Sequence, residues 1–447
     1  MTRKPVRSRR RIYTAAAMVL GISLTAAGCA SSAGSPSSTS AKPYAGQTIV
    51  VDYFSAAPGN NLLANFTKQT GIKVQWNEYQ FDALQTKIQT AMSAKVYFAD
   101  VTDVGLLRLG LFTQAKWYTP LQQYITPSEL AKDVPLSKGW VVDGNLVGVP
   151  VDGQVAATTL NMTMLKKAGI SSAPATFSDF ESDLQALQTT GVSVHPLDIP
   201  FAASEGLSTQ WYQYTMAFGG NILGKNDTPA FTSPSSAGYK AMSWMVNAFK
   251  TGLVPPQNIN YTDAQSQQDE MARGVTAANL SDYTDDVGSL YDNPKLSTVV
   301  GQVKYAATPG VNGAAHNQQF PDGMVVPSTS KHAGAAATFI KYLVSAVPNA
   351  QINGLNGANY SIPEWSGPAS NNQSLKLLAN AGKLPQGQAL AKLLSSSQPA
   401  FPEGSPAWYP QFAQAVYQQI RAAAQGQETV AAAIKSLAQT VNTLRNS

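Results

Sequence analysis

From residue 44 onward, short apolar runs rich in β-branched residues alternate with segments whose apolar residues recur every three or four positions. Runs of the first kind predict buried strands, and segments of the second kind predict amphipathic helices. The first unit is an expected strand at 48–51, a helix from Asn61 that ends at Gly71, and a second strand at 72–76. A strand, a helix and a strand in this order give two parallel strands. The pattern therefore predicts an α/β fold with a parallel sheet.

A turn signal at 143–145 separates two apolar runs and predicts a tight hairpin. Pro150 cannot donate to a ladder, so a strand must bend or end there. Asp152 and Gln154 follow, at the kind of strand end where open α/β sheets bind ligands. Asn161 has the side chain to cap a short helix at about 163–167. We therefore expect one lobe to give way to another in this stretch, with a ligand cleft between the two.

Longer helices are expected in the second half of the chain, at 177–187, 207–218, 237–250 and, in two parts, 410–444. Ser178 and Glu181 have capping-box spacing at the start of the first of these helices. A chain of 447 residues is too long for one hydrophobic core, so the length also favours two lobes.

The N-terminus has the layout of an export signal. Basic residues are followed by a short apolar run, and small residues precede Cys29, the only cysteine. Residues 1–28 are therefore expected to be a signal peptide, too short to be a good spanning helix. The segment 26–29 resembles a bacterial lipobox, which predicts lipidation of Cys29 and anchoring at the extracytoplasmic face of the cell membrane. Residues 29–43 are Ser-rich and predict a flexible tether. General secretory and twin-arginine export both remain open.

The net charge excludes one class of partner. The whole chain has a formal net charge of +5, but residues 1–28 carry six basic residues and no acid. Without them 25 basic residues face 26 acidic ones, a net charge of −1. No basic footprint for nucleic acid remains. Only 13% of residues are charged, about half the usual share, so neutral polar ligands are favoured.

Several residue patterns along the chain bear on its chemistry. The stretch 219–226 approaches a phosphate loop, but Asn226 stands where Ser or Thr must hold magnesium, and it reads as a turn. The three histidines are scattered, so neither a metal site nor a cofactor is expected. Carboxylates near strand ends, Asp152 or Asp282, leave open a secreted glycan-active hydrolase. Aromatic residues near strand ends and loops suit the flat faces of sugar rings.

In order along the chain, several segments resemble the extracellular solute-binding proteins of ABC importers, in the carbohydrate-binding group that includes maltose-binding protein. The segments that carry this resemblance are 48–55, 66–74, 99–121, 144–170, 218–220, 249–252, 271–274, 323–327, 335–344 and 408–427. The chain departs from the family at Tyr283, where a tryptophan is frequent, and in the loop 318–323.

The resemblance implies a two-lobed periplasmic-binding-protein-like fold of type II, with discontinuous lobes. Lobe 1 would comprise 44–150 and 305–348, and lobe 2 would comprise 151–304 and 349–447. It also implies a monomer that is not an enzyme. Such a protein captures a sugar or oligosaccharide between its lobes and delivers it to the transmembrane subunits of an ABC permease.

For ligand contact we expect carboxylates and amides that bind hydroxyl groups, and aromatic rings that stack. The expected residues are Tyr53, Asp103, Asp152, Gln154, Trp211, Tyr283, Asp322, Tyr360 and Trp408. Because tyrosine clusters can bind ferric iron and acidic pockets can bind polyamines, both ligand classes stay open beside sugars.

Overall fold

The structure is a computed structural model that describes residues 42–58, 61–126, 130, 139–262, 270–351, 373–384 and 386–446. Contacts divide the chain into a unit at 1–41 and a compact unit at 42–447, and only the second is described. The expectations for the signal peptide, Cys29, most of the tether and Tyr360 therefore lie outside the described residues.

Lobe 1 is the part of this unit built around a five-stranded sheet, with strands in the order β2-β1-β3-β13-β6. Its strands are β1 (Thr48–Tyr53), β2 (Lys73–Glu78), β3 (Val101–Asp103), β6 (Val149–Pro150) and β13 (Gly323–Val325). Strand β1 is parallel to β2 and β3, which confirms the predicted βαβ unit. Strand β13 runs antiparallel to β3 and β6. The proline that ends β6 lies at the sheet edge, where no ladder bond is lost.

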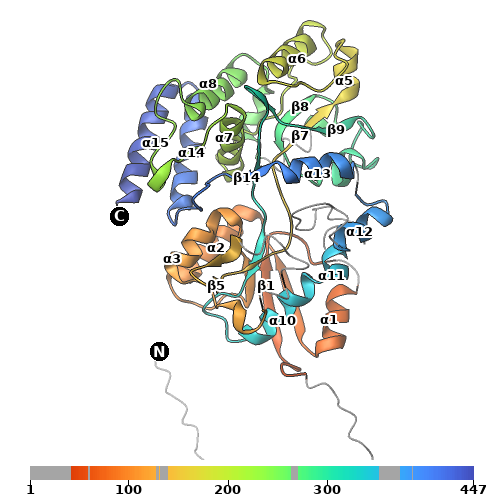
Figure 1. Ribbon diagram of the computed structural model, residues 1–447, viewed down its shortest axis with the longest axis vertical. Coiled ribbons are helices and arrows are strands. Elements are labelled where there is room, and N and C mark those ends of the chain that lie inside the picture. Colours follow the sequence, from red (N-terminus) through yellow and green to blue (C-terminus); the bar gives the residue numbers. More distant parts are fainter. Residues whose placement is uncertain are drawn as a thin grey trace, which may run out of the picture. The chain divides into compact units, whose positions relative to one another are not determined.

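Helices cover both faces of this sheet (Figure 1). They are α1 (Leu62–Thr70), α2 (Phe81–Ser93), α3 (Leu109–Ala115), α10 (Ala333–Leu343) and α11 (Ala346–Ala350), with 3-10 turns η1 (Leu106–Arg108) and η2 (Leu121–Gln123). Helices α1 and α10 pack together through Phe66 and Phe339, whose ring centroids are 5.0 Å apart. The hairpin β4 (Val141–Val142) and β5 (Asn145–Leu146) turns at Asp143 and Gly144, which both have positive φ as expected.

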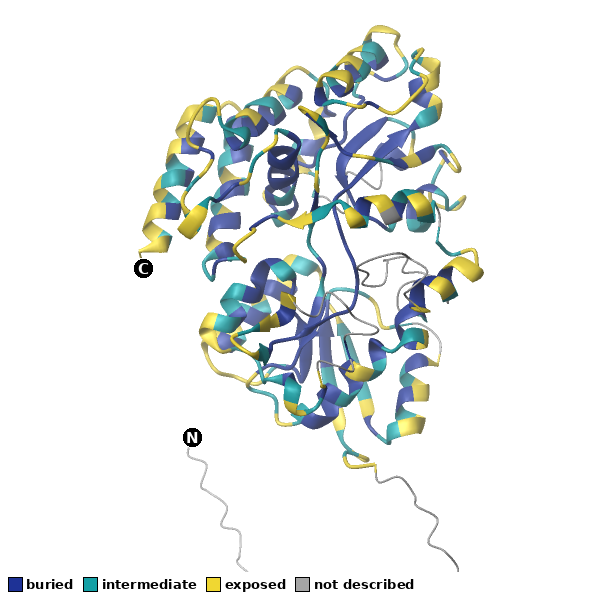
Figure 2. Ribbon diagram, viewed as in Figure 1, coloured by how far each residue is buried: buried dark blue, intermediate teal, exposed yellow. Residues whose placement is uncertain are grey.

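Lobe 2 is built around an antiparallel sheet in the order β8-β7-β9. Its strands are β7 (Ala157–Asn161), β8 (Ala278–Asp282), β9 (Val303–Ala306), β10 (Pro309–Gly310), β11 (Gly313–Ala314), β12 (Asn317–Gln319) and β14 (Ser397–Pro399). Its helices are α5 (Met162–Lys167), α6 (Phe177–Thr189), α7 (Glu205–Ala217), α8 (Ala237–Lys250), α13 (Gly387–Ser395), α14 (Tyr409–Ala424) and α15 (Val430–Arg445). Helix α12 (Gln373–Asn380) packs mainly against α11 of lobe 1, while its Leu375 joins a core cluster of lobe 2. Shorter helical turns are η4 (Lys225–Asp227), η5 (Pro256–Asn260) and η6 (Val287–Tyr291). Helix α7 is almost entirely buried (Figure 2).

The hydrophobic clusters show where the chain changes lobe. Val151 belongs to the core of lobe 1 and Val155 to a core of lobe 2, so the first crossover lies between them. The expected return to lobe 1 at residue 305 does not occur there, because β9 pairs with β7 along its whole length. The chain re-enters the core of lobe 1 only at Met324. The boundary therefore moves to about 320–323, and β10 to β12 stay with lobe 2.

Gly323 lies at this re-entry point, and its substitution tests how tightly the crossover is packed. A Cβ there would stand 2.4 Å from the Trp140 ring and 2.7 Å from the carbonyl oxygen of Val149. We expect Gly323→Ala to lower the free energy of unfolding by ~1–3 kcal/mol, because overpacking forces the backbone to shift. Urea unfolding measures the change. Gly139→Ala is the control, since a Cβ at Gly139 meets nothing within 4 Å, and equal losses in both variants would contradict the account.

Candidate functional site

Four of the expected residues come together at one edge of the lobe 1 sheet. Tyr53 ends β1 and Asp103 ends β3, and these parallel neighbours present their carboxyl ends at the same edge. Asp152 follows β6 and Asp322 precedes β13. Burial raises the pKa of the Tyr53 hydroxyl, and the nearby charges of Asp103, Asp322 and Asp152 raise it further. We call these four residues the strand-end group.

The two crossover segments are tied together within this group. The Asp152 carboxylate Oδ1 accepts hydrogen bonds from the backbone N–H groups of Asp322 at 3.0 Å and Gln154 at 3.4 Å. Asp322 packs close to Gly105, since its Oδ1 would lie only 2.9 Å from a Cβ at that position. Asp152 therefore holds both crossovers against the edge of the sheet.

The carboxyl groups of the strand-end group are poised to be protonated near neutral pH. Burial raises the pKa of Asp103 to about 7, although Arg108 and a hydrogen bond of 2.6 Å from Gln85 favour its charged form. Burial also raises the pKa of Asp152 to about 7, although the two backbone hydrogen bonds that it accepts act to lower this pKa. The pKa of Asp322 is raised well above its ordinary value by burial and by the charges of Asp103 and Asp152.

Arg108 links this group to lobe 2. Its guanidinium donates to Glu205, at the start of α7, with Nη1 lying 2.9 Å from Oε1 and Nη2 bonded to Oε2. The Tyr409 hydroxyl, at the start of α14, donates to the same Glu205 Oε1 at 2.6 Å. Burial acts to lower the pKa of the Arg108 guanidinium. The charge of Glu205 and the hydrogen bonds to it together have the larger effect, so the pKa is raised. Sequence reasoning missed this pair, although a lone arginine five residues after the strand end at Asp103 was a visible signal.

Three polar atoms in this region have no hydrogen-bond partner among the described residues. They are the Tyr53 hydroxyl, Asp103 Oδ1 and Arg108 Nε, although the Asp103 carboxyl group also interacts with the carboxyl group of Asp322. All three side chains are at least nine-tenths buried. Because buried polar groups are nearly always hydrogen-bonded, such atoms are places where a ligand can bond. The set contains a donor, an acceptor and a hydroxyl that can act as either.

The lobe 2 residues of the expected set form a separate group. The Gln154 side chain donates to Asp285 at 2.9 Å and accepts from the Thr284 hydroxyl at 2.6 Å, so it fixes the chain after β8. Tyr283, which is half-buried, meets Phe320 edge to face at a centroid distance of 5.8 Å. The Tyr283 ring lies in the segment that follows β8 and the Phe320 ring in the segment that follows β12, so these two segments contact each other.

The two expected tryptophans differ in environment. Trp211 is completely buried in the core of lobe 2, packs against Phe231, and donates its Nε1–H to Gly238 at 2.8 Å. A ring enclosed in this way offers no face to a ligand, so the expectation that Trp211 stacks on a ligand is wrong. Trp408 is half-buried beside Tyr409, with its ring edge-on to Phe412. It remains a candidate.

Three further features bear on the candidate site and its surroundings. Asp282 is fully buried, and its Oδ2 accepts from Thr159 at 2.5 Å and from the Tyr291 hydroxyl at 2.8 Å. Across the described parts of the chain, no three His, Cys, Asp or Glu side chains are grouped so that they could hold a metal ion. Among the described residues, no helix has the length and apolar character that crossing a bilayer requires.

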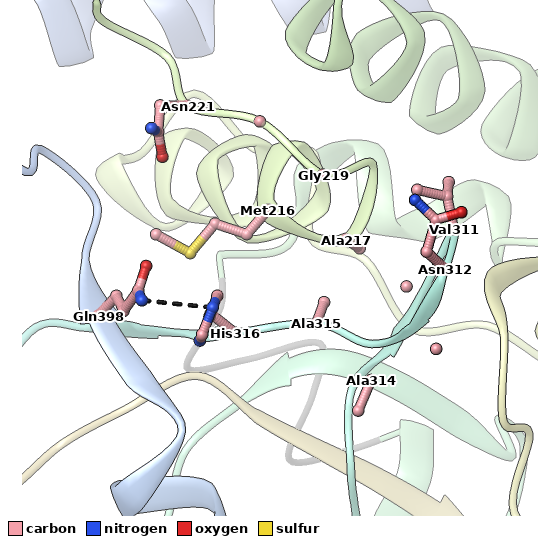
Figure 3. Close-up of a pocket in the computed structure, with 13 residues that line it drawn as sticks. Met216, Ala217, Gly219, Asn221, Val311, Asn312, Ala314, Ala315, His316 and Gln398 are labelled. Carbon is pink, nitrogen blue, oxygen red and sulfur yellow. Dashed lines mark hydrogen bonds between the residues drawn. The ribbon is translucent and has the colours of Figure 1, made fainter.

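A pocket of about 320 Å³ lies elsewhere in lobe 2, between the end of α7 and the hairpin of β10 and β11 (Figure 3). Gly219, Gly220 and Asn221, from the stretch that approaches a phosphate loop, line it together with His316 and Gln398. No expected site residue and no lysine, arginine or carboxylate lines the pocket. It is therefore distinct from the strand-end group and has no charge to hold a phosphate.

The two-lobed arrangement is shared with solved structures of periplasmic binding proteins. Maltose-bound T. maritima MalE3 is 19% identical, with a TM-score of 0.75, over 89% of this chain and 99% of that one. A solute-binding protein of Agrobacterium vitis with bound D-mannitol is 21% identical, with a TM-score of 0.75, over 90% and 98%. One from Thermotoga lettingae bound with α-D-tagatose is 19% identical, with a TM-score of 0.75, over 89% and 100%. These likenesses confirm the predicted fold class.

The family model for bacterial extracellular solute-binding proteins matches residues 49–350, and the chain belongs to this family. Binding proteins of Brucella abortus and Brucella suis are each 25% identical to it over 281 residues, which is 61% of this chain. The match spans 64% of the length of these relatives.

The raised pKa values of the strand-end group predict a pH dependence of stability. A carboxyl group whose pKa is higher in the folded state binds its proton more tightly there, so folding is favoured below the unfolded pKa. This contribution is lost as the pH rises through about 7, the folded pKa of Asp103 and Asp152. We therefore expect the melting temperature to fall between pH 5 and pH 8.

Asp152→Asn should flatten this fall, because the amide oxygen can still accept from both backbone N–H groups but does not titrate. Thermal unfolding across the pH range measures the slope. Asp143→Asn, at an exposed hairpin position, is the matched control and should leave the slope unchanged. If the melting temperature of Asp152→Asn falls as steeply with pH as that of the unsubstituted chain, Asp152 is not the group whose titration lowers the stability.

Proposed function

We propose that this protein binds a neutral sugar or other polyol at the strand-end group and delivers it to an ABC permease. The observation that carries the proposal is the set of three unpartnered polar atoms on Tyr53, Asp103 and Arg108. A polyol supplies hydroxyl groups that both donate and accept, which this set requires. The maltose, mannitol and tagatose bound to proteins of the same fold support the choice of ligand class.

The charge of the site favours a neutral ligand over a polyamine or ferric iron. Three carboxyl groups would attract a cation if all were ionised, but burial raises the pKa of Asp103, Asp152 and Asp322. The Arg108 guanidinium beside them is paired with Glu205, so this ion pair adds no net charge to the site. A protonated carboxyl group can donate to a ligand hydroxyl and accept from it.

We also propose that the protein binds without breaking bonds. Of the two carboxylates considered for hydrolysis, Asp282 is inaccessible because it is fully buried and hydrogen-bonded. Asp152 is engaged by two backbone N–H groups at one oxygen. Neither carboxylate is therefore placed to act as a general acid or as a nucleophile on a bound ligand.

A ligand that contacts both lobes would favour the closed arrangement of the lobes. A ligand shifts an open–closed equilibrium only by its differential affinity for the two states. Arg108 of lobe 1 already bonds Glu205 of lobe 2, so a ligand that adds bonds at Arg108 Nε would strengthen this link. Trp408, Tyr283 and Gln154 would contribute from the lobe 2 side.

In the cell, the protein would be held by a lipid on Cys29 at the extracytoplasmic face of the membrane, through the tether at 29–43. Lipidation by several acyl chains gives stable anchoring, whereas one chain is marginal. It would act as a monomer whose partners are the transmembrane subunits of a permease.

A thermal-shift panel of sugars, polyols, polyamines and ferric iron tests the ligand class, because a ligand of the native state raises the melting temperature. We expect a neutral sugar or polyol to stabilise the protein. Asp103→Asn should then weaken calorimetric affinity for that ligand by ~0.5–1.5 kcal/mol, the usual net value of a hydrogen bond between neutral groups.

Asp143→Asn is the control, since it makes the same chemical change at the exposed hairpin of lobe 1. Stabilisation by polyamines alone would overturn the ligand class, and release of products from an oligosaccharide would overturn the assignment as a binding protein. Unchanged affinity in Asp103→Asn would remove the strand-end group from the site.

A further inference from the structure

A second pocket, of about 570 Å³, lies in lobe 1 and carries a cluster of positive charge. Lys95, Lys116 and Lys331 line it with two aromatic residues, Tyr97 and Trp117. All three lysines are exposed, and none forms an ion pair with another described residue. We call these five residues the basic patch. Its acidic neighbour Asp100 is fully buried, and its oxygens accept from Val50, Tyr97, Ser330 and His332.

Two of these lysines occupy positions where the backbone favours glycine. Lys95 and Lys116 follow α2 and α3 and have φ of 55° and 52°. The next residue in each case donates back into the helix, Val96 to Ala91 at 2.9 Å and Trp117 to Phe112 at 3.0 Å. This is the Schellman arrangement, in which glycine is the usual residue. The positive charge of each lysine suits a helix C-terminus, but the backbone conformation there is one that glycine adopts with less strain.

The patch has the composition of a surface that meets the lipid headgroup region. Val96 and Tyr97 are 56% and 40% exposed beside Lys95, and Trp117 adjoins Lys116. Tyrosine and tryptophan rings favour the membrane–water interface. Lysines near a bilayer are attracted to anionic lipids. Among the described residues, Asp143 also lies near this surface, close enough to Tyr118 to raise the pKa of its hydroxyl beyond the effect of burial.

The patch lies at the end of lobe 1 where the chain enters the fold. Tyr44 packs against Gly334, because a Cβ on that glycine would stand 2.3 Å from the Tyr44 ring. Gly334 is three residues from Lys331 of the patch. On the same side, Lys42 donates to the carbonyl oxygen of Lys68 at 3.0 Å. Residue 42, with which the described compact unit begins, therefore lies at the same end of lobe 1 as the basic patch.

We propose that the basic patch binds the phosphate groups of anionic phospholipids in the membrane to which the chain is anchored. The choice of a membrane over a soluble anion rests on the anchoring proposed above. Strand β1 runs from Thr48, near the chain entry, to Tyr53 of the strand-end group. Six residues of strand span about 20 Å. Contact at the patch therefore turns the ligand-binding edge away from the bilayer and toward the medium.

Vesicle flotation tests the proposal. The chain without residues 1–28, carrying Cys29→Ser, is mixed with vesicles of phosphatidylcholine alone or with 30% phosphatidylglycerol, roughly the anionic share that makes such attraction measurable. We expect binding to the anionic vesicles only, weakened by salt because screening shortens the range of the attraction. The triple variant Lys95→Gln, Lys116→Gln, Lys331→Gln should lower the partition coefficient on the order of 100-fold, about 5-fold for each lysine.

The matched control is Lys166→Gln, Lys240→Gln, Lys295→Gln, which removes three exposed lysines from lobe 2. It should bind like the unsubstituted chain. The pair Lys95→Gly and Lys116→Gly removes charge at positions that accept glycine, so its loss of binding cannot be attributed to misfolding. Both patch variants should keep the sugar affinity of the unsubstituted chain, which separates this proposal from the proposed function.

Three results would overturn the proposal. One is equal binding of the patch triple variant and the control triple variant to anionic vesicles. Another is stabilisation by inorganic phosphate without vesicle binding, which would make the patch a site for a soluble anion. The third is binding of polyglutamate but not vesicles, which would indicate an acidic protein partner.

Discussion

The buried ion pair between Arg108 and Glu205 is the interaction on which the arrangement of the site depends. It joins the 3-10 turn after β3 to the start of α7, two elements that belong to different lobes. Both side chains are about one-tenth exposed, so separating them would leave an unpaired charge in a poorly solvated place. The Tyr409 hydroxyl adds a third group to the same carboxylate. A buried pair of this kind adds little net stability, but the loss of one partner is strongly destabilising because the other charge stays buried.

The strand-end group shows how burial changes the chemistry of carboxyl groups. Viewed as a sequence, three aspartates suggest a negative site that would suit cations. In the structure, burial and mutual repulsion raise their pKa values, so the candidate site carries less negative charge than three ionised aspartates would give it, and the nearby Arg108 is already paired with Glu205. Such a site can exchange hydrogen bonds with hydroxyl groups in both directions, and it penalises a ligand that leaves its polar atoms unpaired.

Local signals in the sequence predicted local structure well. The hairpin at 143–145 follows from residues that accept positive φ, and the Asn161 cap follows from a side chain that bonds the Met164 N–H at 3.1 Å. The capping box of α6 was misplaced, because Thr176 and Asp179 have the same spacing as Ser178 and Glu181. Glu181 instead accepts from the Trp244 ring N–H at 2.6 Å.

Features that depend on distant residues were predicted less well. Tyr53 and Asp103 could be placed because strand ends in a parallel sheet share an edge. Trp211 could not be told from a ligand-stacking ring, since its burial depends on Phe231 and Phe412. The predicted lobe boundary at residue 305 was wrong, because only the pairing of β9 with β7 shows which sheet that strand joins. Arg108 needed knowledge of Glu205, 97 residues further along.

The distance between the lobes tests the account most directly. Spin labels at Lys73→Cys in lobe 1 and Lys240→Cys in lobe 2, on a Cys29→Ser background, report this distance by pulsed electron resonance, because both positions are exposed. With a stabilising sugar or polyol bound, we expect one narrow, short distance distribution. Arg108→Met should broaden it toward longer distances, since the link to Glu205 is lost. A distribution that is the same with and without saturating ligand would contradict capture of the ligand between the lobes.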